Sequence, residues 1–178
     1  MRRIGKKFNV EYIMNPNQSE INEIINFFLV QKEKQLKRTK AWNYLKFSDF
    51  KNYIINLNKL NKINISFTCI KIDKKIISSH IGYMFDDIYY YIFPTYDISY
   101  KKYSPGNILL YKILENIKIY QFKYIDFTIG NEKYKKKLSN NEFSLSEYLK
   151  PFTIKGFIYF VLIKGKFLVK KINYLLKK

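Results

Sequence analysis

The N-terminal third of the chain shows two hydrophobic periods. Residues 7–14 alternate apolar and polar side chains and end at the turn signal Asn15-Pro16, which predicts a first strand. Asn17 can then cap a helix, with Glu20 three residues on as in a capping box. The apolar residues that follow recur at the spacing of one helical face: Ile21, Ile24, Ile25, Phe28 and Leu29.

A second helix is predicted from Ser48, after which the period becomes strand-like. The helix carries four apolar residues on one face: Phe50, Tyr53, Ile54 and Leu57. From Ile63 onward, β-rich runs at 63–72, 76–85 and 89–98 are separated by the connectors DKK and DDI. Short polar connectors between such runs favour an antiparallel meander of three strands.

The turn YSPG at residues 103–106 leads into a strongly apolar stretch. Its periodicity predicts a helix over residues 107–121, followed by a short strand at 123–129 that ends before Gly130. A strand, a helix and a second strand joined by short loops form a crossover unit, so the two strands are expected to be parallel. The predicted order is βααβββαβ, in a mixed and mostly antiparallel sheet of the α/β (α+β) class.

The C-terminal tail predicts one more strand and a basic amphipathic helix. Residues 147–155 resemble a strand that Pro151 interrupts or places at an edge. The helix, over residues 155–178, has one apolar face formed by Phe157, Phe160, Val161, Leu168, Ile172 and Leu175. Eight lysines and no acidic residue occur from Lys150 onward, and the longest apolar run is too short to span a bilayer.

Length and cysteine content favour a single domain over residues 1–178 in a reducing compartment. A chain of this length is expected to bury roughly 70% of the surface exposed when it is unfolded. Cys69 is the only cysteine, so no intrachain disulfide can form, and the N-terminus lacks the apolar core of a signal peptide. The expected location is the cytoplasm. The basic tail also allows peripheral contact with an anionic membrane.

The formal net charge of +19 has two explanations. Dense positive charge can attract nucleic acid or an anionic membrane. Alternatively, A/T-rich codons raise lysine content without selection for any polyanion. Arginine, the better reader of phosphates and bases, occurs only three times, which favours the codon explanation and makes a nucleic-acid partner the less favoured reading.

Several motifs between residues 96 and 135 resemble, in their order, the C-terminal signature of CelD-type acetyltransferases. These enzymes are named for cellulose biosynthesis, are related to FemAB-like transferases and have the GNAT acyltransferase fold. The matching residues are Tyr96 and Asp97, then Ser104, Pro105 and Gly106, then Asp126 and Phe127, then Gly130, Glu132, Tyr134 and Lys135. Departures from the family pattern occur at Asn131, Lys133 and Leu138. The resemblance covers the C-terminal half of a family whose members often contain two GNAT-like halves, so a shortened or inactive form is one expectation.

The Ser-Pro-Gly turn has a physical interpretation of its own. A helix N-terminus presents unpaired N–H groups and a partial positive charge, and glycine lets an anion approach the main chain. By resemblance, the anion is the pyrophosphate of acetyl-CoA or another acyl-CoA. It would be held by the amides of Gly106, Asn107 and Ile108, with Ser104, Lys101 and Lys102 nearby. The alternative is an ordinary Pro-Gly helix start.

The resemblance also suggests which side chains take part in the transfer. The leading carboxylates are Asp97 and Asp126; burial can make Asp126 a base, or it can pair with Lys135 as an anchor. Tyr134 can protonate the leaving thiolate, stack on the substrate or fill the core. Tyr96, Glu132 and Lys135 are expected at the acceptor, and Glu132, Tyr134 and Lys135 are placed on a loop after the fifth strand.

Two further residues have mainly structural interpretations. Pro94 cannot donate to a strand ladder, so it either ends its strand or marks the place where the fourth strand diverges from the fifth. His80 is the only histidine, and a lone histidine is more often structural than a base or ligand. With one histidine and one cysteine, no transition-metal site is expected.

Two classes of function follow. The first is an N-acyltransferase that moves an acyl group, in the first instance acetyl, from acyl-CoA to an amine such as an amino sugar or a cell-envelope precursor. A FemAB-like variant would take its donor group from aminoacyl-tRNA. The second is a non-enzymatic basic module that binds an anionic membrane or RNA through the lysine-rich tail.

Overall fold

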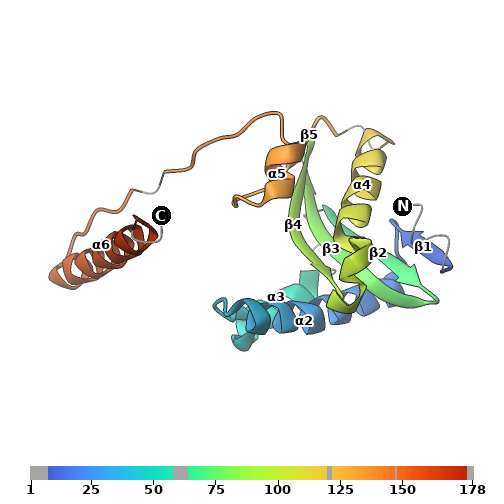
Figure 1. Cartoon of the computed structure of the whole chain (residues 1–178), viewed down its shortest axis with the longest axis horizontal. Helices are drawn as coiled ribbons and strands as arrows, with labels where there is room; N and C mark the ends of the chain where they lie inside the picture. The colour runs from blue at the N-terminus through green and yellow to red at the C-terminus, as the bar shows by residue number, and fades with distance from the viewer. Residues whose placement is uncertain (1–7, 58–63, 120–121, 147, 176–178) are drawn as a thin grey trace. The chain divides into compact units, whose positions relative to one another are not determined.

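A computed structural model describes residues 8–57, 64–119, 122–146 and 148–175. The chain divides into two compact units, unit 1 (residues 1–138) and unit 2 (residues 139–178). Unit 1 contains a five-stranded sheet covered by helices on both faces, and unit 2 contains one long helix (Figure 1). The prediction of one domain over residues 1–178 stays a prediction.

The sheet of unit 1 has its strands in sequence order. The first four are antiparallel neighbours, and the fifth pairs with the fourth in parallel. The meander and the parallel crossover are thus confirmed. The strands are β1 (Val10–Ile13), β2 (Asn64–Ile72), β3 (Lys75–Phe85), β4 (Ile88–Tyr96) and β5 (Tyr124–Asp126).

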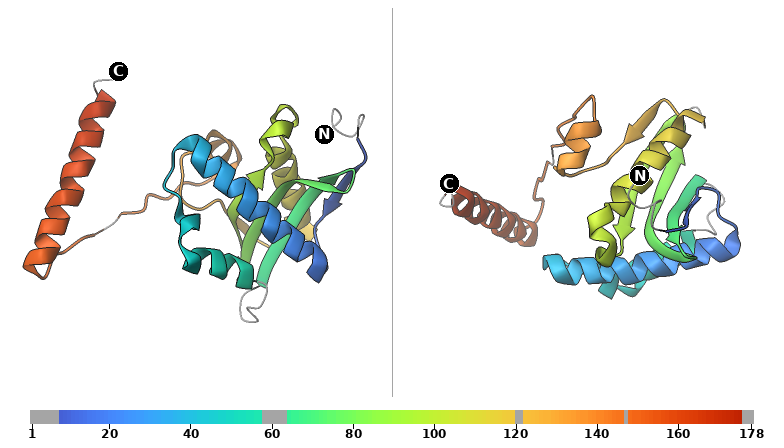
Figure 2. Two further views of the ribbon diagram at one scale, coloured as in Figure 1. Left: turned by 90° about the horizontal axis from the view of Figure 1, so that it is seen from below. Right: turned by 45° about the vertical axis from the view of Figure 1, so that its right-hand side comes forward.

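Helices cover the two faces of this sheet separately (Figure 2). On one face, α2 (Gln18–Thr39) and α3 (Ser48–Asn56) bury Ile24, Ile25, Phe28 and Ile54 against β2 and β3. On the other face, α4 (Pro105–Ile119) buries Leu109, Leu110 and Ile113 against Ile70, Ile77 and Tyr89. Short elements complete the unit: η1 (Tyr44–Lys46), η3 (Ile98–Tyr103) and α5 (Lys133–Leu138).

The first helix begins where the sequence predicts. The Glu20 amide donates to the Asn17 side chain at 3.0 Å, and the Asn17 amide donates to the Glu20 carboxylate at 2.9 Å. These two bonds satisfy donors that the first helical turn cannot pair internally. The predicted capping box is confirmed, and it fixes the start of the helix that lies along the sheet.

Unit 2 differs from the prediction at its start. Residues 148–153 form no strand, so the expected strand around Pro151 is wrong for the described part of the segment. The helix α6 spans Ile154–Leu175, and the last three residues of the predicted helix lie outside the described residues. In the described part of the chain, no helix combines the length and apolar character needed to cross a bilayer.

Candidate active site

The strand β4 has an open edge over residues 91–96. The strand β5 pairs with β4 only at Ile88, Tyr89 and Tyr90. In the described part of the chain, no other strand pairs with β4 on that side. Pro94, which has no N–H to donate, lies within the open edge and opposite His80 of β3. The predicted divergence of the fourth and fifth strands is therefore present in the structure.

A bulge in β4 adjoins the open edge. The register between β3 and β4 shifts from Ile81–Phe93 to Tyr83–Tyr90, so two residues of β4 face Gly82. A Cβ atom added at Gly82 would lie 2.8 Å from the carbonyl oxygen of Tyr90 and 2.6 Å from Cε1 of His80. Glycine is required here because both contacts are shorter than a real Cβ atom allows.

His80 supports the bulge from the α4 side of the sheet. Its ring is fully buried and stacks on Tyr91, with centroids 4.2 Å apart and an interplanar angle of 7°. The Nδ1 atom lies 3.2 Å from the Tyr89 hydroxyl, and Nε2 has no partner among the described residues. Burial lowers the pKa of His80 to about 3, so the ring is neutral at physiological pH.

Tyr91 links His80 to α5 beyond the open edge. The Tyr91 ring makes edge-on contacts with Phe127 at 5.9 Å and with Tyr134 at 6.4 Å between centroids. Phe127 and Tyr134 also contact each other, at 6.2 Å. Aromatic packing of this kind holds α5 against the sheet face where β4 and β5 part.

The predicted anion site lies at the start of α4. Ile108 donates its amide to the Ser104 carbonyl at 3.1 Å, so that amide is already used within the helix. In the described part of the chain, the amides of Gly106 and Asn107 donate to no acceptor. Two main-chain donors therefore remain where the sequence suggested three, and Pro105 contributes none.

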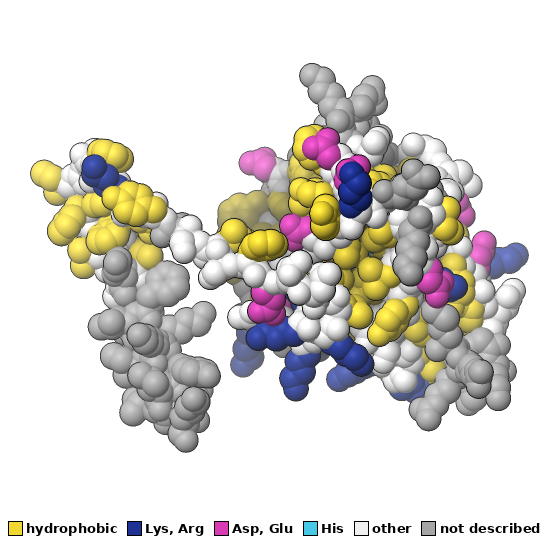
Figure 3. All heavy atoms as spheres, turned by 90° about the horizontal axis from the view of Figure 1, so that it is seen from above, with side chains coloured by type: hydrophobic (Ala, Val, Ile, Leu, Met, Phe, Trp, Pro, Cys, Tyr) yellow, Lys and Arg dark blue, Asp and Glu magenta, His cyan; other side chains and the backbone are white. Residues whose placement is uncertain are grey.

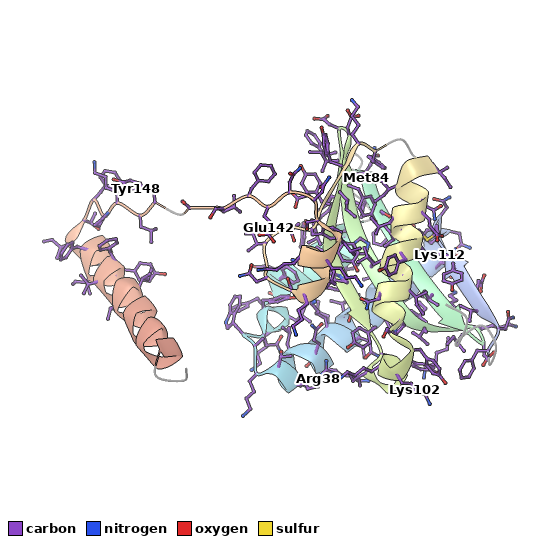
Figure 4. All side chains as sticks on the ribbon, turned by 45° about the horizontal axis from the view of Figure 1, so that its top comes forward. Arg38, Met84, Lys102, Lys112, Glu142 and Tyr148 are labelled. Carbon is purple, nitrogen blue, oxygen red and sulfur yellow. The ribbon has the colours of Figure 1, made fainter. Side chains whose placement is uncertain are left out.

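Side chains around these two amides leave the start of α4 accessible. Asn107 and Ser104 are exposed, and Ser104 adopts a left-handed conformation with φ of 52° that turns the chain into the helix. Lys101 and Lys102 are exposed on η3, and Figure 4 shows Lys102 beside this end of α4. The positive charge expected near the turn is thus present.

Tyr96 lies against the first turn of α4. A Cβ atom added at Gly106 would be 3.5 Å from Cδ1 of Tyr96, an ordinary van der Waals distance. Tyr96 therefore lies beside the predicted donor site, although the sequence analysis expected it at the acceptor. Packing therefore does not require glycine at position 106.

The two aspartates have well-defined hydrogen bonds of their own. Asp97 caps η3, accepting from the Ser99 amide at 3.0 Å and from the Ser99 hydroxyl at 2.7 Å. Burial acts to raise the pKa of Asp97, but these bonds outweigh it and the pKa lies below the usual value. Asp126 is exposed, and its carboxylate accepts from the Thr128 amide at 2.6 Å. The burial on which a basic Asp126 depended is absent.

Lys135 forms an ion pair with Glu132, whereas the sequence analysis offered Asp126 as its partner. Its ammonium lies 3.1 Å from the Glu132 carboxylate and donates to the Ile129 carbonyl at 2.8 Å. Lys135 and Tyr134 belong to the helix α5, so the loop predicted at this point is wrong for both residues. Glu132 directly precedes that helix, and its carbonyl accepts from the Lys135 amide at 2.9 Å.

The ionisable groups at α5 have shifted pKa values. Burial acts to raise the pKa of Glu132, but hydrogen bonds from its own backbone and from Lys135 outweigh it, so the carboxylate is ionised at neutral pH. Burial, with a smaller effect of Glu132, raises the pKa of the half-buried Tyr134 to about 12. Tyr134 is thus a protonated donor at neutral pH.

Lys32 of α2 is a site residue that the sequence analysis missed. Its ammonium donates to the carbonyl of Pro94, in the open edge, at 3.4 Å. Burial lowers the pKa of Lys32, and the nearby charge of Glu132 partly offsets that effect. A signal existed, because Lys32 continues the apolar stripe of Ile25 and Phe28 where another apolar residue would be expected.

The mixed sheet, the short pairing of β5 with β4, and the helix α4 that starts beside the end of β4 are the features expected of the GNAT acyltransferase fold. The chain belongs to the acetyltransferase (GNAT) domain family, whose model matches residues 14–136. It is therefore an acetyltransferase of that class, in which an acyl group passes from CoA to an amine-type acceptor. No group of three metal-ligating side chains occurs in the described ranges.

Solved structures with a similar fold include three of note. An integron cassette protein from the mobile metagenome of V. cholerae has a TM-score of 0.56 and 16% identity, covering 85% of this chain and 97% of that chain. A possible acetyltransferase from Clostridium difficile 630 has a TM-score of 0.55 and 11% identity, covering 78% and 96%. An aminoglycoside acetyltransferase from an uncultured soil metagenomic sample, in complex with sisomicin, has a TM-score of 0.53 and 12% identity, covering 84% and 99%. These likenesses establish the fold, and no curated protein matches the chain.

Proposed function

We propose that this protein is a CelD-type N-acetyltransferase that transfers an acetyl group from acetyl-CoA to a primary amine on a small sugar-derived molecule. The observation that carries the proposal is the open edge of β4 next to the free amides of Gly106 and Asn107. Every residue assigned a role below belongs to unit 1. The motif order from Tyr96 to Lys135 supports the CelD-type assignment.

The donor is bound at the start of α4 in this proposal. The two free amides, the helix dipole and the exposed Lys101 and Lys102 favour a diphosphate. The acyl-bearing arm of the donor would then follow the open edge of β4, where backbone groups have no strand partner. In this proposal the thioester lies between β4 and α5.

The transfer itself forms one bond and breaks one. The nitrogen of the neutral amine attacks the thioester carbonyl carbon, the carbon–sulfur bond breaks, and the CoA thiolate leaves. The amine loses one proton and the thiolate gains one, so no other reactant is required. Positioning supplies much of the rate enhancement for a reaction of this kind.

The residues near α5 suit the acceptor side. The ionised Glu132 attracts the ammonium form of an amine, and Lys135 holds Glu132 in place through their ion pair. Tyr134 can donate a hydrogen bond to the developing thiolate, although its raised pKa makes complete proton transfer less favourable. Asp97 and Asp126 have structural roles in this proposal. Asp97 caps the start of η3, and Asp126 accepts a hydrogen bond from the Thr128 amide in the turn that follows β5.

An amino sugar is the acceptor class we propose. The ionised Glu132 can bind the ammonium group of such a sugar, and the Lys32 ammonium, which donates to the Pro94 carbonyl, has further N–H groups for a sugar hydroxyl. The fold is also shared with an aminoglycoside acetyltransferase that binds sisomicin. We place the reaction in the reducing cytoplasm, because Cys69 is the only cysteine of the sequence and the fold uses it as a buried free thiol.

Calorimetry with acetyl-CoA tests the donor site directly. We expect saturable binding to the unchanged protein and loss of binding in Gly106→Glu, because the new carboxylate would compete for the two amides. Negative charge in the first turn favours a helix, so this variant is expected to fold. Ile119→Glu adds the same charge at an exposed position about 20 Å away along α4 and serves as the matched control.

The proposal fails if acetyl-CoA does not bind the folded protein, or if Gly106→Glu binds as well as Ile119→Glu. Circular dichroism of both variants separates a lost site from a lost fold. An acetylation assay over a panel of aminoglycosides and simple amino sugars then tests the acceptor. If only non-sugar amines are acetylated, the proposed donor site stands and the proposed amino-sugar acceptor is wrong.

A further inference from the structure

The helix α6 of unit 2 has an apolar surface that the proposed transferase chemistry does not use. Phe157, Ile158, Val161 and Leu162 are between 51% and 60% exposed. Their spacing of one, three and four residues places them on one side of the helix. Figure 3 shows hydrophobic side chains covering the described part of unit 2. A soluble surface seldom carries so many large exposed apolar side chains together.

The segment leading into α6 adds to this apolar surface. Phe152 and Ile154 are 85% and 83% exposed, directly before the first turn of the helix. Tyr148, four residues before Phe152, is 85% exposed. Aromatic residues at the start of an apolar helix are typical of segments that bind where lipid meets water.

The charge around α6 has a single sign. From Lys150 to the last residue the sequence contains eight lysines and no aspartate or glutamate. Lys150 and Lys155 are exposed at the start of this stretch, and the Lys150 ammonium lies 5.5 Å from the Phe152 ring. In an anionic membrane, lysines of this kind can pair with the head groups while the apolar face of the helix enters the hydrocarbon below them.

We infer that α6 lies in the interface of an anionic phospholipid membrane, with Phe157, Ile158, Val161 and Leu162 in the acyl region and with Lys150 and Lys155 at the head groups. A polyanion such as RNA would pair with the lysines and leave the apolar face in water. Crossing the bilayer is excluded for the described helices by their length and composition. The inference is independent of the acetyl-transfer reaction and would place unit 1 close to a membrane surface.

Sedimentation with phospholipid vesicles tests this inference on the full chain. We expect binding to vesicles of phosphatidylcholine mixed with phosphatidylglycerol, and at least about tenfold weaker binding to phosphatidylcholine alone. Raising the salt from about 50 to about 500 mM is expected to weaken the binding to the anionic vesicles.

Two matched double variants separate α6 from other exposed apolar residues. Ile158→Gln/Leu162→Gln is expected to reduce vesicle binding about tenfold or more, because two apolar side chains no longer enter the lipid. Val30→Gln/Ile55→Gln removes two exposed apolar side chains from unit 1 and is expected to leave vesicle binding unchanged.

A fluorescence measurement reports insertion directly. Trp42 is the only tryptophan, so Trp42→Phe with Phe157→Trp creates a single probe on α6. Its emission is expected to move to shorter wavelength when anionic vesicles are added.

Several outcomes would overturn the inference. They are equal binding to neutral and anionic vesicles, unchanged binding by the α6 double variant, or binding to RNA without binding to vesicles. A dimer in light scattering that the α6 double variant dissociates, with no vesicle binding, would assign the apolar face to a second copy.

Discussion

The buried His80 makes the stability of the protein depend on pH between 5 and 7. Its pKa is about 6.5 in an unfolded chain and about 3 in the folded protein, because burial disfavours the charged ring. Between these two values the unfolded state binds more protons than the folded state. The stability contribution is therefore fully present above pH 6.5 and is lost as the pH falls toward 3.

The size of the effect follows from the two pKa values. Integrating the difference in proton binding gives a loss of about 0.7 kcal/mol from pH 7 to 6 and about 1.2 kcal/mol from pH 6 to 5. The free energy of unfolding is thus expected to fall by about 2 kcal/mol over this range. Aspartate and glutamate titrate mainly below it, and cysteine and the terminal amine mainly above it.

Urea unfolding followed by circular dichroism at pH 7, 6 and 5 measures this loss. His80→Gln is the matched variant, since His80 is the only histidine and glutamine does not titrate. The variant is expected to lose stability at all three pH values, because it lacks the stacking on Tyr91, yet to show a nearly constant free energy of unfolding. Two results would refute the reasoning: a free energy of unfolding of the wild-type protein that does not change with pH, or a fall of about 2 kcal/mol that persists in His80→Gln.

Two further predictions concern the backbone of unit 1. Gly82→Ala is expected to destabilise the protein by about 1–3 kcal/mol in urea unfolding, because its Cβ would lie 2.8 Å from the Tyr90 carbonyl oxygen. Gly106→Ala is the control, because a Cβ there makes only an ordinary van der Waals contact. An equal loss of stability in the two variants would contradict the close packing at the bulge. Asn17→Ala is expected to cost about 1 kcal/mol through loss of the capping box with Glu20, and an unchanged unfolding midpoint would show that the cap contributes nothing.

The parts of the fold that the sequence predicted correctly depend on local or short-range signals. The start of α2 follows from Asn17 and Glu20, which lie three residues apart and bond to each other. The meander follows from polar turns between β-rich runs, and the parallel pair follows from a crossover with a helix between two strands. Each signal involves neighbours in the chain, so no knowledge of tertiary contacts was needed.

The errors occurred where distant contacts decide. The segment around Pro151 has strand-like residues, but in the described part of unit 2 no second strand is present to pair with it. The helix α5 has only six residues and little apolar periodicity, and a distant contact holds it, because the Tyr134 ring packs edge-on against Tyr91 of β4.

The candidate site shows the same division. The turn at Ser104 and the open edge near Pro94 were predictable from the turn residues and the family resemblance. The use of the Ile108 amide by Ser104 and the position of Lys32 beside Pro94 depend on geometry that only the fold supplies. A lysine within an apolar helical stripe is, however, a signal that can be sought in other sequences of this family.

The short pairing of β5 has a consequence for motion. Only three residue pairs join β5 to the rest of the sheet, and Tyr124 and Asp126 are exposed. Segments with few buried contacts open locally at low free energy, well before global unfolding. Amide hydrogens of β5 are therefore expected to exchange with solvent earlier than those of β3. Local opening of β5 would also widen the space beside α5, so that bulky molecules could enter and leave there.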